Sequence, residues 1–301
     1  MNTGKSLLHT TKTNPTRRQA LKGFGLGALG LTSLGLLHAP NAAAAGTTIT
    51  ASDINILNFA LNLEYLEAEF YTYATTGSGI EAKGIAVTGR GTRGNVLIKS
   101  SPKVPFTTPA IEQYANEIAA DEQAHVRFLR QVLGGRAVAR PTIDLQNSFT
   151  AAARAAGVIG SADTFDPFAD EVSFLLAAFI FEDVGVTAYR GAAPLLNNKV
   201  VLSAAAGILG TEAYHAANVR TKIYELGGTA QAAAQKISDL RDALDGTGDD
   251  DQGVVLGGKA NIVPTDANGL VFARTPQQVL NIVYFAKNVR KGGFFPNGVN
   301  T

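Results

Sequence analysis

Beyond residue 45 the chain has only two histidines, and each follows a glutamate by three positions, in Glu122-Gln-Ala-His125 and Glu212-Ala-Tyr-His215. Residues three apart on a helix share a face, so each Glu–His pair can converge on one point. Carboxylate and imidazole groups together are typical ligands of divalent transition metals. The two motifs therefore predict a metal-binding function.

Both motifs occupy positions that an apolar helix stripe would fill. In the expected helix 109–133, hydrophobic residues recur in alternating steps of four and three from Ile111 to Leu129, and Glu122 and His125 continue that series. The expected helix 199–226 repeats the pattern with its own Glu-x-x-His motif. This spacing is typical of a bundle seam, so the motifs are predicted to face the core.

Two further glutamates face the same predicted core. Glu182 lies within an apolar run, and Glu64 lies on the apolar stripe of the first expected helix. Glu67, one turn after Glu64, lies on an adjacent apolar stripe and is an alternative or additional ligand. Glu64 is preferred because Tyr71 follows it by seven residues, as Tyr189 follows Glu182. Both tyrosines are predicted to be core aromatic residues.

Buried carboxylates need compensating charge. An isolated buried carboxylate protonates rather than staying charged, whereas two divalent cations balance four carboxylates. One Glu from each of two helices and a Glu-x-x-His from each of the other two is the arrangement of dimetal carboxylate bundles. The predicted cofactors are two divalent metal ions, iron or manganese. Their predicted ligands are Glu64, Glu122, His125, Glu182, Glu212 and His215.

Other acidic residues are given lesser roles. Asp121, Asp183 and Glu117 are predicted at the edge of the site or in solvent, with Asp183 as a candidate to orient a ligand histidine. An acidic cluster near the C-terminus lacks the alternating pattern of a calcium loop and is predicted to be a solvated loop. Its members are Asp245, Asp249, Asp250 and Asp251.

The elements that position these residues are helical. Helices are expected over 50–74, 109–133, 167–193 and 199–226, with weaker ones over 230–244 and 276–286. The segment 77–106 is rich in Gly and β-branched residues and predicts an irregular loop or small hairpin. The fold class is therefore all-α, a four-helix bundle with a long first insertion and an irregular C-terminal extension from about residue 229. No change in composition demands a second domain within 46–301.

The first 45 residues resemble an export signal. They contain Arg17-Arg18, a short glycine-rich apolar stretch and an Ala-rich end, which is typical of a removed twin-arginine signal peptide. The protein is therefore expected in the periplasm or cell envelope, without a membrane span in its mature form. The remainder carries 21 basic against 25 acidic residues and no Cys. Its mildly acidic balance argues against nucleic-acid binding, and disulfides and thiolate metal sites are excluded.

Several segments resemble the ferritin-like superfamily, and more narrowly the desiccation-related ferritin-like proteins of bacteria and plants. They are Leu57–Ala74, Glu117–Gly134, Phe174–Pro194, Gly210–Arg220 and the C-terminal FARTPQQVLNIVYF and GGFFPNGVN. The resemblance implies a four-helix bundle whose dimetal site is carried by the six residues named above. The long insertion and tail depart from cage-forming ferritins, so a hollow iron-storage shell is not expected, whereas a smaller homo-oligomer is compatible.

Two functions are compatible with these sequence features. The leading expectation is an exported oxidoreductase that handles iron or manganese and a small-molecule oxidant, oxygen or peroxide, in stress protection. Ferroxidase, peroxidase and manganese catalase-like activities all fit. The alternative is a non-enzymatic desiccation-protective or structural envelope protein in which the metals only stabilise the bundle.

Overall fold

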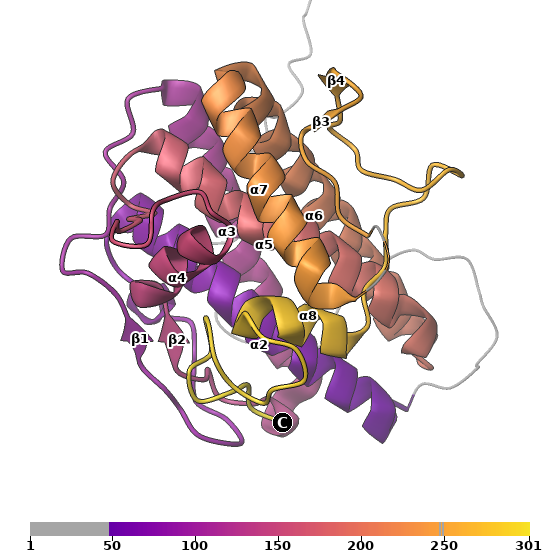
Figure 1. Ribbon diagram of the computed structural model, residues 1–301. Coiled ribbons are helices and arrows are strands. Elements are labelled where there is room, and N and C mark those ends of the chain that lie inside the picture. The colour runs from indigo at the N-terminus through magenta and orange to yellow at the C-terminus, as the bar shows by residue number, and fades with distance from the viewer. Residues whose placement is uncertain (1–47, 247, 249) are drawn as a thin grey trace, which may run out of the picture. The chain divides into compact units, whose positions relative to one another are not determined.

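The computed structural model describes residues 48–246, 248 and 250–301, and the predicted signal peptide 1–45 lies outside these residues. Four long helices form the bundle: α2 (Ala51–Thr76), α3 (Pro109–Leu133), α5 (Glu171–Ala192) and α6 (Lys199–Leu226). Helix α2 packs mainly against α3, and α5 mainly against α6 (Figure 1). The predicted all-α bundle is confirmed.

Local caps explain where these helices begin. Thr50 and Asp53 form a capping box at α2, and the Asn198 side chain accepts from Val200 N and Val201 N at the start of α6. Helix α5 begins at Glu171, four residues after the predicted Pro167. The reason is Asp170, whose side chain accepts from the backbone N–H of Ser173 and so caps the helix there.

The first insertion follows an irregular path rather than forming a hairpin. It contains a 3₁₀ turn, η1 (Ile80–Lys83), and a short strand, β1 (Val96–Leu97), that pairs in parallel with β2 (Ile143–Asp144). A short helix that the sequence analysis did not predict, α4 (Asn147–Ala155), follows β2. The insertion is anchored at buried Glu69 of α2, which pairs with Arg140 and accepts from Ile80 N at 3.0 Å.

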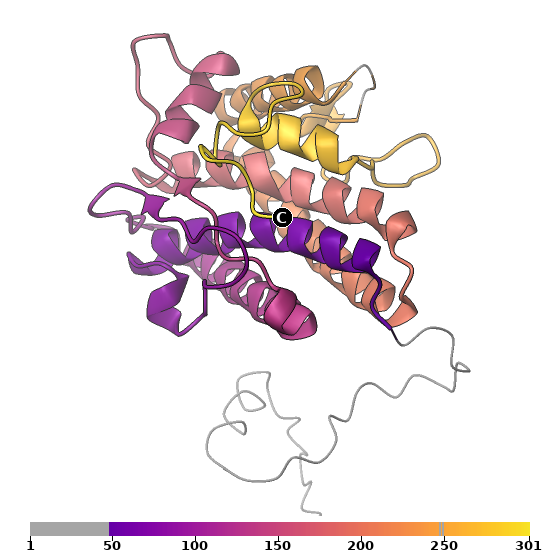
Figure 2. The same ribbon diagram turned by 90° about the horizontal axis from the view of Figure 1, so that it is seen from below.

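The C-terminal extension adds α7 (Gly228–Asp245), a strand pair β3 (Val255–Leu256) and β4 (Lys259–Ala260), and α8 (Pro276–Tyr284). Helix α7 packs against α6, α5 and α8. In both ribbon views α8 and the chain after it lie over α2 and α5 (Figure 1, Figure 2). The extension therefore covers one side of the bundle.

A buried ionic cluster ties this extension to α5 and α6. The Nη2 atom of Arg241 donates to Asp183 Oδ2 at 2.9 Å and to Asp251 Oδ1 at 2.7 Å. Arg274 donates to Asp245 Oδ2 at 2.6 Å and to Asp251 Oδ2 at 2.8 Å. We call this group the arginine cluster, and its members are Arg220, Arg241, Arg274, Asp183, Asp245 and Asp251.

The arginine cluster corrects two sequence-based expectations. The predicted solvated loop is wrong for Asp245 and Asp251, which are buried: Arg274 pairs with both, and Arg241 also pairs with Asp251. Asp249 lies outside the described residues. Asp183 is buried rather than in solvent, and it accepts from Arg220 and Arg241 instead of orienting a histidine.

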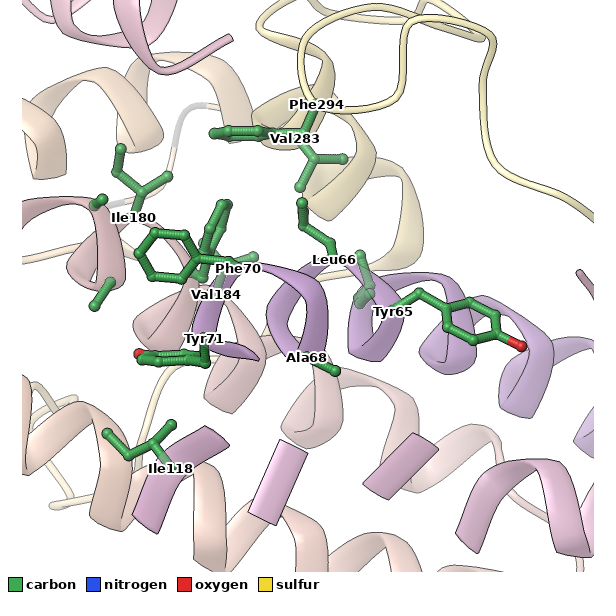
Figure 3. Close-up of a cluster of buried hydrophobic side chains, with 14 of the residues drawn as sticks. Tyr65, Leu66, Ala68, Phe70, Tyr71, Ile118, Ile180, Val184, Val283 and Phe294 are labelled. Atoms are coloured by element: carbon green, nitrogen blue, oxygen red, sulfur yellow. The ribbon is translucent and has the colours of Figure 1, made fainter. Parts of the chain in front are cut away.

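Helix α5 passes through the middle of the apolar core. Glu171–Leu195 is long and apolar enough to cross a membrane, but 89% of its most apolar window is buried inside the protein. Phe70 of α2 stacks on Phe174 with ring centroids 5.6 Å apart, and Figure 3 shows it beside Val184 and Ile180 of α5. The apolar character of α5 is therefore accounted for by core packing.

Candidate metal centre

Six side chains from the four bundle helices meet inside the core. Each is at most 8% exposed, although Glu and His are seldom fully buried without partners. All six are the residues predicted from the sequence: Glu64 from α2, Glu122 and His125 from α3, Glu182 from α5, and Glu212 and His215 from α6.

One set of potential ligands surrounds His125. Its Nδ1 atom lies 3.2 Å from Glu64 Oε2, 3.6 Å from Glu122 Oε2 and 3.4 Å from Glu212 Oε1. One ligand atom from each of these four residues lies within 4.8 Å of the others. This group can hold a metal ion.

A second set surrounds His215. Its Nδ1 atom lies 3.1 Å from Glu122 Oε1 and 3.6 Å from Glu182 Oε2. Glu182, Glu212 and His215 form the second potential ligand group, again within 4.8 Å, so Glu212 belongs to both groups. The two imidazole centroids are 6.4 Å apart. Glu122 and Glu212 thus lie between two equivalent Glu–His pairs, as two bridging carboxylates would.

The carboxylates are positioned but left unsatisfied. Both oxygens of Glu122 and of Glu212, and one oxygen of Glu182, are buried without a hydrogen-bond partner. Such atoms carry a large desolvation penalty unless a cation or donor meets them. The donor set, oxygen-rich with one imidazole nitrogen for each position, fits divalent iron or manganese. The residues present therefore fit a dimetal group.

The electrostatics of these groups are those of an anionic cluster. Burial, despite the opposing effect of His125, raises the pKa of Glu64 to about 8. Burial lowers the pKa of His215, but the charges of Glu182 and Glu122 and the hydrogen bond to Asp121 outweigh it and raise that pKa to about 11. In the absence of a metal ion, Glu64 and His215 thus tend to keep their protons at the positions where cations would bind.

The two predicted core tyrosines belong to the site. The Tyr71 hydroxyl donates to Glu182 Oε1, and the Tyr189 hydroxyl donates to Glu64 Oε1. Each tyrosine therefore fixes the carboxylate of the opposite half of the bundle. The equal seven-residue spacing from Glu64 to Tyr71 and from Glu182 to Tyr189 is the sequence signal that could have predicted this role.

Glu67 is also buried at the centre but belongs to neither ligand group. Its Oε2 atom has no hydrogen-bond partner. Burial, reinforced by the charges of Glu212 and Glu122, raises its pKa well above the usual range. The equivalent position in α5, three residues after Glu182, is Gly185. The structure thus places Glu64 among the potential ligands and Glu67 beside them.

Asp121 meets the outer nitrogen of one imidazole. Its Oδ2 atom lies 3.2 Å from Nε2 of His215, and its side chain is 45% exposed. A carboxylate here fixes the tautomer that leaves Nδ1 facing the other ligands. Asp183 was the candidate for this role in the sequence-based prediction. Asp121 fills it instead because it projects from α3 across to α6.

Comparisons with known proteins agree with this geometry. A family model described as a ferritin-like domain matches residues 52–225. The desiccation-related protein PCC13-62 of Craterostigma plantagineum is 33% identical over 249 residues, which is 77% of this chain and 77% of the relative. The ferritin-like catalase Nec2 of Nesocodon mauritianus is 30% identical over 272 residues, 84% of this chain and 85% of the relative. No solved structure matches the chain significantly.

Proposed function

This chain belongs to the ferritin-like domain family, and we propose that it is a catalase-like enzyme that disproportionates hydrogen peroxide at a buried pair of manganese or iron ions. The observation that carries the proposal is the pair of equivalent Glu–His sets joined by Glu122 and Glu212. Two metal positions that share ligands suit a reaction in which one site has to supply two electrons. The name of one relative, a ferritin-like catalase, supports peroxide as the substrate.

The reaction balances without any further reactant. Two molecules of hydrogen peroxide give two of water and one of oxygen, so one peroxide is reduced and the other is oxidised. A bound pair of manganese or iron ions supplies the two-electron redox chemistry of this exchange. The protein has to bind the ions, orient the carboxylates, exclude bulk water and carry the protons that move between the two peroxides.

Particular side chains perform these tasks in the proposal. Glu122 and Glu212 would hold both ions, and the hydroxyls of Tyr71 and Tyr189 orient Glu182 and Glu64, respectively. Glu67 lies buried beside these residues with its Oε2 unpartnered, and so is placed to hold a proton. A proton held there can pass to the oxygen that leaves as water.

The experiment follows oxygen release from the exported protein. Protein loaded with Mn²⁺ or with Fe²⁺, in separate samples, is mixed with hydrogen peroxide at an oxygen electrode. We expect one oxygen for every two peroxides, at a rate above that of the same concentration of free metal. Glu122→Gln removes a bridging charge and should lower the rate by at least about 100-fold, because even neighbours of metal ligands affect activity 10- to 100-fold.

Glu112→Gln is the matched control. Glu112 is exposed in the first turn of the same helix, so this variant should keep the wild-type rate and metal content. Oxygen release no faster than with free metal, or an unimpaired Glu122→Gln variant, rejects the proposal. Consumption of oxygen during Fe²⁺ oxidation, with no release from peroxide, points to a ferroxidase instead.

A second candidate function is protection without catalysis, which the desiccation-related relative supports. The metals then act only by binding the folded state and raising its stability. The same Glu122→Gln variant separates the two functions in cells that are dried and rewetted. If it folds and protects as well as wild type while releasing no oxygen, the non-enzymatic function is correct.

Export is also part of the proposal. The twin-arginine pair Arg17-Arg18 supports transport of a folded, metal-loaded protein to the periplasm or envelope. Replacing both arginines by lysine should leave the precursor inside the cell, as measured by cell fractionation. Unchanged export of the variant contradicts a twin-arginine route.

A further inference from the structure

The two sides of the metal centre are closed in different ways. Toward α3 and α6, the imidazole of His215 stands between the carboxylates and the surface, with its Nε2 atom occupied by Asp121. On α2 and α5, the positions three residues after Glu64 and Glu182 carry Glu67 and Gly185. The same positions after Glu122 and Glu212 carry the two histidines. Over the side of α2 and α5 lie α8 and the C-terminal segment (Figure 1, Figure 2).

A small apolar cavity lies between the metal centre and α8. Its volume is about 10 Å³, which is close to the smallest space that holds one water molecule. Glu67 and Gly185 line it on the bundle side, and Ile282, Val283 and Phe294 line it on the side of the extension. Figure 3 shows Val283 and Phe294 directly over Leu66 of α2. The cavity therefore lies between Glu67 of the bundle and the side chains of Val283 and Phe294 in the extension.

At the bundle end of the cavity, glycine at position 185 lets a carboxylate of the metal centre approach the backbone of α5 closely. A Cβ atom at Gly185 would lie 2.4 Å from Glu212 Oε2 and 3.6 Å from Glu67 Oε1. Glu212 thus packs directly against Gly185, and Gly185 and Glu67 in turn line the cavity. Glu67, buried and with its Oε2 unpartnered, is the polar group that a molecule in the cavity would meet.

The outer end is held shut by backbone contacts. Phe294 N donates to Val283 O at 2.9 Å, and Asp144 N donates to Phe294 O at 3.0 Å. This close approach requires glycine at 293, where φ is +47° and a Cβ atom would lie 2.2 Å from Val283 O. The backbone of the cover is fixed, so passage depends on side-chain movement. Phe294 also packs against Phe181 with centroids 4.8 Å apart, which leaves Val283 as the smaller obstacle.

We propose that Val283 and Phe294 form a gate through which small uncharged molecules reach Glu67 and the metal centre, an inference that rests on the function proposed above. The apolar lining admits hydrogen peroxide and oxygen but disfavours ions, since moving a charge out of water is costly. The narrow cavity excludes bulky organic peroxides. Val283 and Phe294 are thus specificity-determining residues that touch no metal ligand.

The test measures how fast nitric oxide, a small uncharged probe, binds to Fe²⁺-loaded protein in stopped-flow absorbance. Val283→Ala removes part of the gate and should raise the association rate by about 5-fold, whereas Val283→Phe should lower it by about 10-fold, because binding that needs a rearrangement associates more slowly. Val283→Ala should also begin to consume tert-butyl hydroperoxide, which wild type should not.

Val279→Ala is the matched control, because Val279 is equally buried on α8 but does not line the cavity. It should bind nitric oxide at the wild-type rate, which separates gating from general destabilisation. Thermal unfolding of each variant shows whether it folds. If the larger side chain of Val283→Phe prevents folding, the comparison of Val283→Ala with wild type decides the result. Equal rates in wild type, Val283→Ala and Val279→Ala overturn the gate. A complete lack of nitric oxide signal in wild type refutes the metal centre itself, and the gate with it.

Discussion

Two buried charged clusters lie on either side of α5, and they differ in balance. The arginine cluster pairs three arginines with three aspartates, so its formal charges cancel. The metal centre combines five glutamates, including Glu67, with two imidazoles. Within the described residues, seven of the ten buried side-chain atoms without a hydrogen-bond partner belong to the metal centre.

This difference separates a structural role from a binding role. A charged cluster whose formal charges cancel within the chain holds elements together and needs no further ion for charge balance. A cluster with excess anionic oxygens must take up protons or cations to stay buried. Asp183 and Glu182 are adjacent in sequence yet belong to different clusters, because successive residues of α5 point to different sides of the helix.

The largest expected effect comes from breaking the balanced cluster. Arg241→Met leaves Asp183 and Asp251 buried without one of their cations, and we expect a loss of about 3–5 kcal/mol in the free energy of unfolding. Urea denaturation monitored by circular dichroism measures this loss. The loss should be the same with and without metal, because the cluster does not depend on the ions.

Lys236→Met is the control on the same helix. Lys236 is exposed, so the free energy of unfolding should change by less than about 0.5 kcal/mol. An Arg241→Met variant as stable as this control would mean that the arginine cluster contributes nothing to the attachment of the extension.

The sequence could predict the metal centre better than the arginine cluster. Glu122 and His125 occupy core positions of a strongly periodic helix, and local spacing alone places them together. Asp251 and Arg241 are brought together by the path of an irregular tail, which no local pattern encodes. The boundaries of the four bundle helices were predicted to within a few residues, whereas α4 was missed because its nine residues provide little periodic signal.

A second, smaller effect should appear when the metal-free protein is titrated. Burial raises the pKa of Glu64 to about 8 in the folded protein. Between the lower pKa of the unfolded chain and pH 8, the folded protein therefore binds more protons than the unfolded chain, and its stability falls as pH rises. His215, with its pKa raised to about 11, stabilises fully below its unfolded value near 6.5 and loses this contribution as pH rises. Both signs agree, and we expect Tm to fall by about 5 °C between pH 5.5 and 8.5.

Metal loading should reverse this slope. Metal binding requires deprotonated ligands, so its affinity and the stability it adds both increase with pH. Calorimetry of metal-free and metal-loaded samples at the two pH values provides the comparison. Parallel slopes in the two samples would show that the ions do not replace the protons, and the anionic cluster would not be a metal site.

The smallest effect concerns the two halves of the metal centre. His215 is supported by Asp121, whereas the equivalent position in α6, one residue before Glu212, is Thr211. Asp121→Asn removes the charge beside His215 Nε2 and should weaken the metal position at His215 about 10-fold, a typical effect of a ligand's hydrogen-bond partner. Competition titration with a metal chelator measures both affinities, and the position at His125 should be unchanged.

The stability of the metal-free Asp121→Asn protein should hardly change, since the Asp121 side chain is 45% exposed and a surface charge contributes little. A fall in both metal affinities would show that the two positions bind as one unit through Glu122 and Glu212. No change in either affinity would show that packing alone orients His215. Only a loss confined to the position at His215 supports a pair of metal positions that differ in how they are held. The position at His125 and Glu64 would then depend on its carboxylates, because Thr211, the residue equivalent to Asp121, has no carboxylate to offer His125.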